Sequence, residues 1–132
     1  MEQTILVVDD QEDERDAMAN LLHRQHYLVE VAADGQEAID RLHNGASLPD
    51  LVLLDLNMPV MDGWEFLFHV TQDGSLRHLP VVVISGSPVV PDEIVVPLHV
   101  TFVAKPLRPH LIVKLIAEML QDFGPDRSAS MD

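Results

Sequence analysis

The chain has 132 residues, of which 47% are hydrophobic and 23% charged, and this length and balance fit a single globular domain. Its formal net charge of −14 argues against nucleic-acid binding, because proteins that bind the phosphate backbone carry basic patches. The lack of cysteine excludes disulfides and thiolate metal sites, and no apolar run has the length of a membrane-spanning helix. Since the chain also begins without the features of a signal peptide, we expect a cytoplasmic protein.

The first half of the chain alternates short apolar runs with stretches of helical period. Residues 4–8 are mostly branched and apolar and predict a buried strand, and residues 12–25 place apolar side chains on one helical stripe. Residues 28–32 predict a weaker strand, which Glu30 interrupts as a strand at a sheet edge would allow. A turn at residues 34–35 then leads into a short helix.

The same alternation continues through the second half of the chain. It predicts strands at residues 51–54, 81–84 and 100–104, and helices at residues 64–70 and from about residue 108 to residue 122. We therefore expect one domain over residues 1–122 and a flexible tail over residues 123–132.

Strict alternation of strands and helices predicts an α/β fold, in which a five-stranded parallel sheet is covered by helices on both faces. Four of the five predicted strands end in reactive polar side chains, namely Asp9 with Asp10, Asp55, Ser85 and Lys105. Ligands of such sheets bind at the carboxyl ends of the strands. We therefore expect these side chains, which lie far apart in the sequence, to meet at one edge of the sheet.

Three carboxylates at one sheet edge require compensation. Within about 5 Å of each other they repel by roughly 3 kcal/mol per pair at an effective dielectric constant near 20, so folding needs either a proton or a cation. Oxygen ligands suit a hard divalent ion, and we expect Mg²⁺ bound by Asp10 and Asp55, with Asp9 acting through water. The backbone carbonyl of Asn57 is a further candidate ligand.

Phosphoryl transfer is the chemistry that this set of residues favours. A carboxylate such as Asp55 can attack phosphorus, while the metal ion and Lys105 offset the negative charge and the hydroxyl of Ser85 binds a phosphoryl oxygen. Each residue also has a simpler interpretation. Asp10 could cap the following helix, Ser85 could be an ordinary strand-end serine, and Lys105 could be a solvated lysine in a turn.

Five segments occur in a fixed order: ILVVDD at residues 5–10, LLDLNMP at 53–59, MDG at 61–63, SG at 85–86 and FVAKP at 102–106. Together they resemble the receiver domains of two-component response regulators, including the stand-alone chemotaxis type, from about residue 4 to residue 122. The resemblance implies the doubly wound fold of that family, with strand order 2-1-3-4-5. It also implies that a phosphohistidine on a sensor kinase or on a histidine phosphotransfer protein is the phosphoryl donor.

The same resemblance assigns the acids and the metal. It implies that Asp55 is the phosphorylation site, that Asp9 and Asp10 bind Mg²⁺, and that the carbonyl of Asn57 completes the ligand set.

The resemblance also implies that the hydroxyl of Ser85 takes part in the switch and that Lys105 is the lysine of the family's phosphorylation site. It further implies a cis peptide bond between Lys105 and Pro106. Phe102 takes the place of an aromatic side chain that swings inward when the hydroxyl moves, although a place in the core is its simpler interpretation.

One segment departs from the family pattern. Between Gly86 and His99, three prolines among valines leave room for little more than one helical turn, where receiver domains have a longer helix. That helix belongs to their phosphorylation-sensitive surface, so we expect output here through an altered or partner-ordered surface.

Two other functions compete with a phospho-accepting receiver. A Mg²⁺-dependent phosphatase with an aspartate nucleophile would have a second acid two residues later, where this chain has Asn57, and would need a cap domain. A receiver fold used only for constitutive docking would normally have lost the acids or the lysine. We therefore expect a receiver that is not itself an enzyme, either stand-alone or part of a hybrid kinase, with a protein target and no nucleic-acid or membrane partner.

Overall fold

Five parallel strands form the centre of this computed structural model, which describes residues 2–45, 47–56, 63–86 and 99–123. The strands are β1 (Thr4–Val8), β2 (Leu28–Ala32), β3 (Leu51–Asp55), β4 (Val81–Ser85) and β5 (Val100–Ala104), and they pair in the order β2-β1-β3-β4-β5. Both the five-stranded parallel sheet and the order that the resemblance implies are confirmed.

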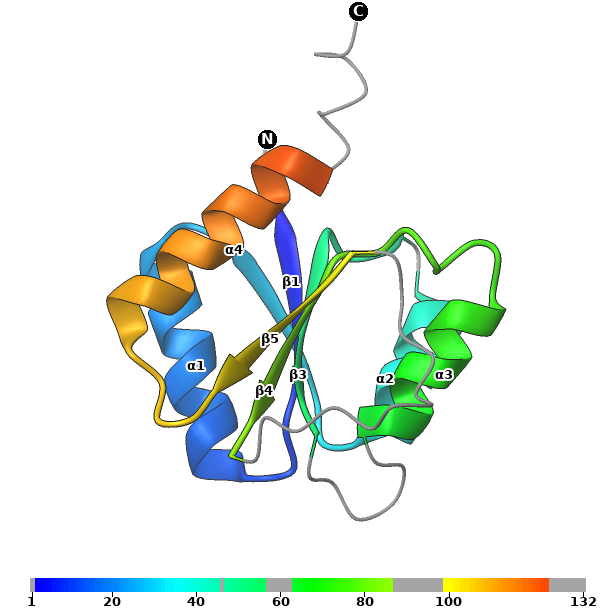
Figure 1. Ribbon diagram of the computed structural model, residues 1–132, viewed down its shortest axis with the longest axis horizontal. Helices are drawn as coiled ribbons and strands as arrows, with labels where there is room; N and C mark the ends of the chain where they lie inside the picture. Colours follow the sequence, from blue (N-terminus) through cyan, green and yellow to red (C-terminus); the bar gives the residue numbers. More distant parts are fainter. Residues whose placement is uncertain (1, 46, 57–62, 87–98, 124–132) are drawn as a thin grey trace, which may run out of the picture.

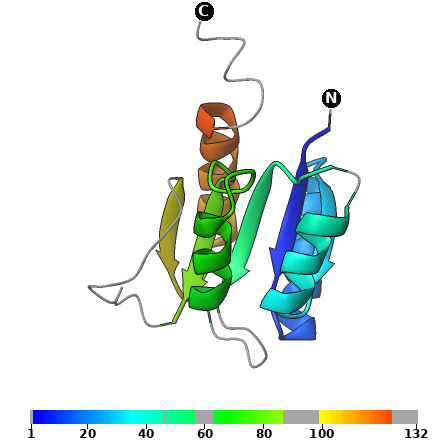
Figure 2. The same ribbon diagram turned by 90° about the vertical axis from the view of Figure 1, so that its right-hand side faces the viewer.

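In the described ranges, four helices cover the two faces of the sheet: α1 (Glu12–Arg24), α2 (Gly35–Asn44), α3 (Gly63–Gln72) and α4 (Pro109–Phe123). Figure 1 shows α1 and α4 on one face and α2 and α3 on the other, and Figure 2 shows the strands side by side between these layers. None of the helices in the described ranges has the length and hydrophobicity needed to cross a lipid bilayer. The predictions for the segment between Gly86 and His99 and for the tail mostly concern residues 87–98 and 124–132, which lie outside the described part. Phe123, which the sequence analysis placed in the tail, is the last residue of α4.

The two faces of the sheet have separate apolar cores. Central parallel strands are buried on both sides and therefore consist of continuous apolar runs, as β3 and β4 do. One core packs α2 and α3 on the sheet through side chains such as Phe66 and Leu67, and the other packs α1 and α4 through Leu22, Ile112 and Ile116. Each fully buried side chain of this size contributes about 1.5–3 kcal/mol of transfer free energy. Alternate residues of one strand thus hold both helical layers in place.

The edge strand β2 has the mixed composition that its position permits. Leu28 and Val31 are about half exposed, while Glu30 forms an ion pair with Arg41 of α2. The predicted placement of this strand at the sheet edge is confirmed.

Asp34 caps the N-terminus of α2 as well as forming the predicted turn. Its Oδ1 accepts a hydrogen bond from the backbone N–H of Glu37 at 2.9 Å, and the Glu37 carboxylate accepts one from the N–H of Ala33 at 3.2 Å. This exchange resembles a capping box and satisfies backbone donors at the start of the helix.

Gly63, the first residue of α3, lies directly against the end of β3. Its N–H donates to the carbonyl oxygen of Leu56 at 2.9 Å. A Cβ at this position would lie 2.6 Å from the Cα of Leu56 and 3.2 Å from the carbonyl oxygen of Asp55. Only glycine permits this approach, so the start of α3 is held close to the last residues of the central strand.

We expect Gly63→Ala to destabilise the fold by about 1–3 kcal/mol, because the added methyl group would force the backbone at Leu56 to move. Gly74→Ala is the matched control, since a Cβ there meets no atom within 4 Å in the described part of the chain. Urea unfolding of both variants measures the difference in free energy. Equal stability of the two variants would show that the close approach at Gly63 is unimportant.

Candidate functional site

The carboxyl ends of the strands meet at one edge of the sheet, where the arrowheads lie in the lower part of Figure 1. Asp55 ends β3 and Ser85 ends β4, and both residues are only 5% exposed. The backbone N–H of Lys105, just after β5, donates to the carbonyl oxygen of Ser85 at 2.9 Å. The predicted convergence of strand ends therefore brings these three residues to one place.

Three acids form a cluster at this edge. Asp9, Glu14 and Asp55 each contribute one carboxylate oxygen, and these three oxygens lie within 4.8 Å of one another. Asp9 follows β1, where its N–H donates to the carbonyl oxygen of Ala32 at 3.1 Å and its Oδ1 accepts from the N–H of Gln11 at 2.8 Å. These backbone bonds hold the Asp9 carboxylate toward the site.

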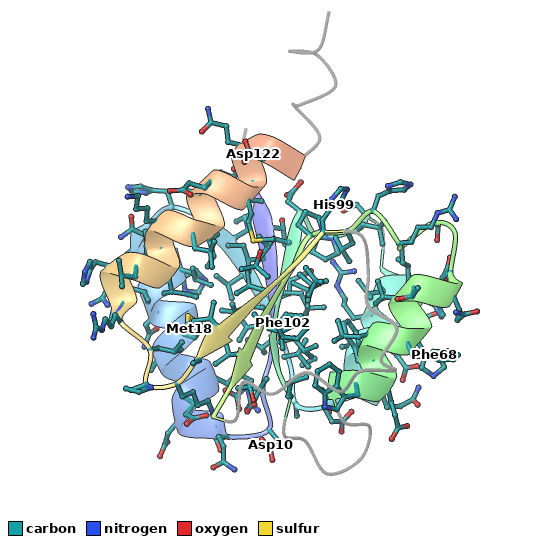
Figure 3. All side chains as sticks on the ribbon, viewed as in Figure 1. Asp10, Met18, Phe68, His99, Phe102 and Asp122 are labelled. Carbon is teal, nitrogen blue, oxygen red and sulfur yellow. The ribbon has the colours of Figure 1, made fainter. Side chains whose placement is uncertain are left out.

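The cluster differs in one member from the ligand set that the sequence predicts. Among the described residues it contains Glu14 and does not contain Asp10, the half-buried residue labelled at the lower edge of Figure 3. Asp10 does not cap α1 either, because the N-cap residue is Gln11. The sequence analysis did not single out Glu14, and its nearness to Asp9 in the chain was the available signal. The predicted carbonyl ligand Asn57 lies outside the described residues.

Lys105 supplies a positive charge at the site. Its Nζ lies 3.8 Å from Oδ2 of Asp55 and 3.6 Å from Oε2 of Glu14. Both separations exceed a normal hydrogen bond, so a small movement would let the ammonium group donate to an oxygen placed between these acids. The peptide bond that follows, Lys105–Pro106, is cis, the isomer that the resemblance implies.

The pKa of Asp9 is raised to about 6, mainly because burial disfavours its charged form. The hydrogen bond from Gln11 opposes this shift, whereas the charges of Asp55 and Glu14 add to it. Burial, with a smaller contribution from the neighbouring acids, therefore keeps a proton on Asp9 above the usual range of a carboxyl group. A cation at the same place would relieve the repulsion.

Phe102 lies on β5, where it pairs in register with Val83 of β4. Its ring is half-buried and packs against the core beneath α3, with its centroid 5.9 Å from that of Trp64 and the two planes inclined by 34°. The sequence analysis placed Trp64 at the start of a helix but did not predict its contact with Phe102, because apolar periodicity shows that a residue faces the sheet without showing which strand it meets.

A cavity of about 800 Å³ opens beside the acids and extends between α1 and the sheet. Asp9, Glu14 and Lys105 line its polar end, while Met18, Leu21 and Leu107 are among the apolar residues along the rest. The site can therefore be approached from solvent along an apolar surface.

The chain is similar in sequence and in fold to known protein domains. A profile of the response regulator receiver domain matches residues 5–117. The receiver domain of the hybrid histidine kinase CckA is 34% identical, with a TM-score of 0.72 over 89% of this chain and 99% of that one. The chemotaxis protein CheY4 of Vibrio cholerae is 26% identical, with a TM-score of 0.77 over 91% of this chain and 100% of that one.

A longer relative shows the same similarity over part of its length. The chain is 33% identical over 127 residues to the 3′,5′-cyclic-nucleotide phosphodiesterase regA of Dictyostelium discoideum. The matched region covers 93% of this chain and 16% of that protein. The chain also spans a fifth or less of the response regulator and sensor kinases that it matches, so the activities of these whole proteins do not transfer with the similarity.

The raised pKa of Asp9 predicts how stability depends on pH. The folded protein holds this proton with a pKa of about 6 against an ordinary value of 3.8, so the contribution of Asp9 to the free energy of unfolding falls as pH rises between these values. We expect Asp9→Asn to remove this slope and Asp10→Asn, which removes the same charge outside the cluster, to keep it. Urea unfolding in the presence of a chelator measures both, and identical slopes would contradict the assignment.

Proposed function

The chain belongs to the response regulator receiver family, and on that premise we propose that it accepts a phosphoryl group on Asp55 and thereby switches a partner-binding surface. The observation that carries the proposal is the buried Asp55 carboxylate, which lies 3.8 Å from the ammonium group of Lys105 at an edge open to solvent. A nucleophile and a cation so placed suit phosphoryl transfer, in which catalysis consists mostly of positioning and charge stabilisation.

The acid cluster fits Mg²⁺ as the cofactor. Its donors are all carboxylate oxygens, the ligands that a hard divalent ion prefers. The three oxygens lie within 4.8 Å of one another, so rotation of the side chains could bring them onto one ion. We infer that Asp9, Glu14 and Asp55 would hold the ion, with Asp10, which directly follows Asp9, and the carbonyl of Asn57 as the remaining candidates. When bound, the ion supplies positive charge next to the transferring group.

Asp55, Lys105 and Ser85 have different roles in the proposed phosphoryl transfer. An oxygen of Asp55 forms a bond to phosphorus as the bond from phosphorus to the donor imidazole nitrogen breaks, and the electron pair stays on that nitrogen. Lys105 offsets the charge on the phosphoryl oxygens. Ser85, buried at the end of the neighbouring strand, donates its hydroxyl hydrogen to one of these oxygens after transfer.

Switching would follow from the attachment of Ser85 to β5. Because the carbonyl oxygen of Ser85 accepts from the N–H of Lys105 at 2.9 Å, movement of Ser85 toward the phosphoryl group displaces the end of β5. Phe102 lies on the same strand, two residues before Ala104, which pairs with Ser85. We propose that its ring turns inward as space opens beside Ser85, so that phosphorylation changes the surface formed by β4 and β5.

The apolar surface beside the site is suited to binding a protein that donates the phosphoryl group. The apolar surface along Met18, Leu21 and Leu107 can accept apolar side chains next to the phosphohistidine of a sensor kinase or histidine phosphotransfer protein. The similarity to the receiver domain of a hybrid histidine kinase supports such a donor. The chain itself would catalyse only its own phosphorylation and slow dephosphorylation, and a separate target protein would carry the output.

We expect incubation with acetyl phosphate and Mg²⁺ to add one phosphoryl group to the parent protein and none to Asp55→Asn. Lys105→Ala should slow incorporation by about 10-fold to 100-fold, because a charge that stabilises the transferring group is lost. Lys114→Ala, which removes an exposed lysine of α4, is the matched control and should react at the parent rate. Intact-protein mass spectrometry follows the reaction, and equal incorporation in Asp55→Asn and the parent would exclude Asp55 as the acceptor.

The composition of the metal site has its own test. We expect Glu14→Gln to weaken Mg²⁺ binding by about tenfold, because it removes one carboxylate of the cluster, the scale of effect seen for residues supporting a metal ion. Glu12→Gln removes the same charge from the exposed first turn of α1 and should bind Mg²⁺ nearly as well as the parent. Titration calorimetry with MgCl₂ compares them, and equal affinities would remove Glu14 from the ligand set.

A further inference from the structure

The residue after Asp55 is joined to α3 by direct backbone contact. The carbonyl oxygen of Leu56 accepts from the N–H of Gly63 at 2.9 Å, and no Cβ fits between the two backbones. The deeper residues Phe66 and Leu67 are fully buried and fix the rest of α3 on the sheet. The backbone contact between Leu56 and α3 therefore lies in the first turn of that helix.

Trp64, the next residue of that turn, contacts the ring of Phe102. Their centroids are 5.9 Å apart, with the planes inclined by 34°, and both side chains are half-buried at the margin of the same apolar core. Phe68, one turn further along α3, is 49% exposed and has its ring contact with the neighbouring His69 instead. Phe68 is therefore an aromatic residue of the same helix whose ring contact lies elsewhere.

The contact is made while Phe102 is only partly buried. It therefore stabilises this position of the ring relative to one in which the ring is fully enclosed beside Ser85. Tilted aromatic pairs at such distances contribute enough to change an equilibrium between two positions by about 3-fold to 10-fold.

We propose that Trp64 is a positioning residue for the switch, which holds the ring of Phe102 against α3 and so sets how readily Asp55 is phosphorylated. The inference rests on the proposed function of Asp55 and adds a second aromatic residue to it. Trp64 is linked to the acceptor on one side through Gly63 and Leu56, and to β5 on the other side through Phe102. Small phosphoryl donors react with the fraction of molecules in which the Phe102 ring is already enclosed beside Ser85. Weakening the contact between Trp64 and Phe102 raises this fraction and therefore the rate of phosphorylation.

Rates of phosphorylation by acetyl phosphate with Mg²⁺, followed by intact-protein mass spectrometry, test the proposal. We expect Trp64→Leu to react about 3-fold to 10-fold faster than the parent protein. Trp64→Phe, which keeps an aromatic ring, and Phe68→Leu, the matched loss of a ring from the same helix, should stay within about 2-fold of it. A Trp64→Leu rate no different from that of Phe68→Leu would overturn the proposal.

A double-substitution cycle separates positioning from a general effect on stability. If Trp64 acts through Phe102, Trp64→Leu should have no effect on the rate in a Phe102→Leu background. An undiminished effect in that background would overturn the proposal, and it would do so even if the single variant behaved as expected.

The emission of Trp64 gives a second readout, because the chain contains one tryptophan. We expect its fluorescence to change when the parent is phosphorylated and to stay constant in Asp55→Asn under the same conditions. Phosphorylation of Asp55 without a change in emission would overturn this inference and leave the proposed function intact. Failure of the parent to incorporate phosphate would overturn both.

Discussion

The burial of one carboxylate constrains the rest of this structure. Asp55 ends a strand whose other residues are all apolar, and in the sheet this residue is only 5% exposed. A charge in that position needs compensation, since an uncompensated buried carboxylate costs several kcal/mol. The nearby ammonium group of Lys105 provides part of it. The acids Asp9 and Glu14 increase the negative charge, so the site as a whole favours a further cation.

The same constraint connects the site to the two elements beside it. On one side, the backbone after Asp55 contacts Gly63, which begins α3. On the other side, Ser85 is bonded through its carbonyl oxygen to the N–H of Lys105 at the end of β5. Any change in charge at Asp55 therefore acts on backbones that are already in contact. On the proposed function, these connections would carry the effect of a phosphoryl group on Asp55 to α3 and β5.

Much of the fold could be predicted from the sequence, because consecutive branched residues identify buried strands and the polar residues that end them mark one edge of a parallel sheet. Asp55, Ser85 and Lys105 were found in this way, while the strand order came from the resemblance to receiver domains. Glu14 was missed because its contribution depends on how far a helical side chain reaches across to β3. The pairing of Trp64 with Phe102 was missed for a related reason, since it depends on the packing of α3 against β5 and not on any local pattern.

The identity of the phosphorylated atom tests the central claim most directly. An acyl phosphate on an aspartate is reduced by borohydride to homoserine, which leaves a permanent mark in the chain. After treatment with acetyl phosphate, Mg²⁺ and borohydride, peptide mass spectrometry should find homoserine at position 55. Reduction at another acid, or phosphate that survives at a serine or histidine while position 55 remains aspartate, would contradict the proposed function.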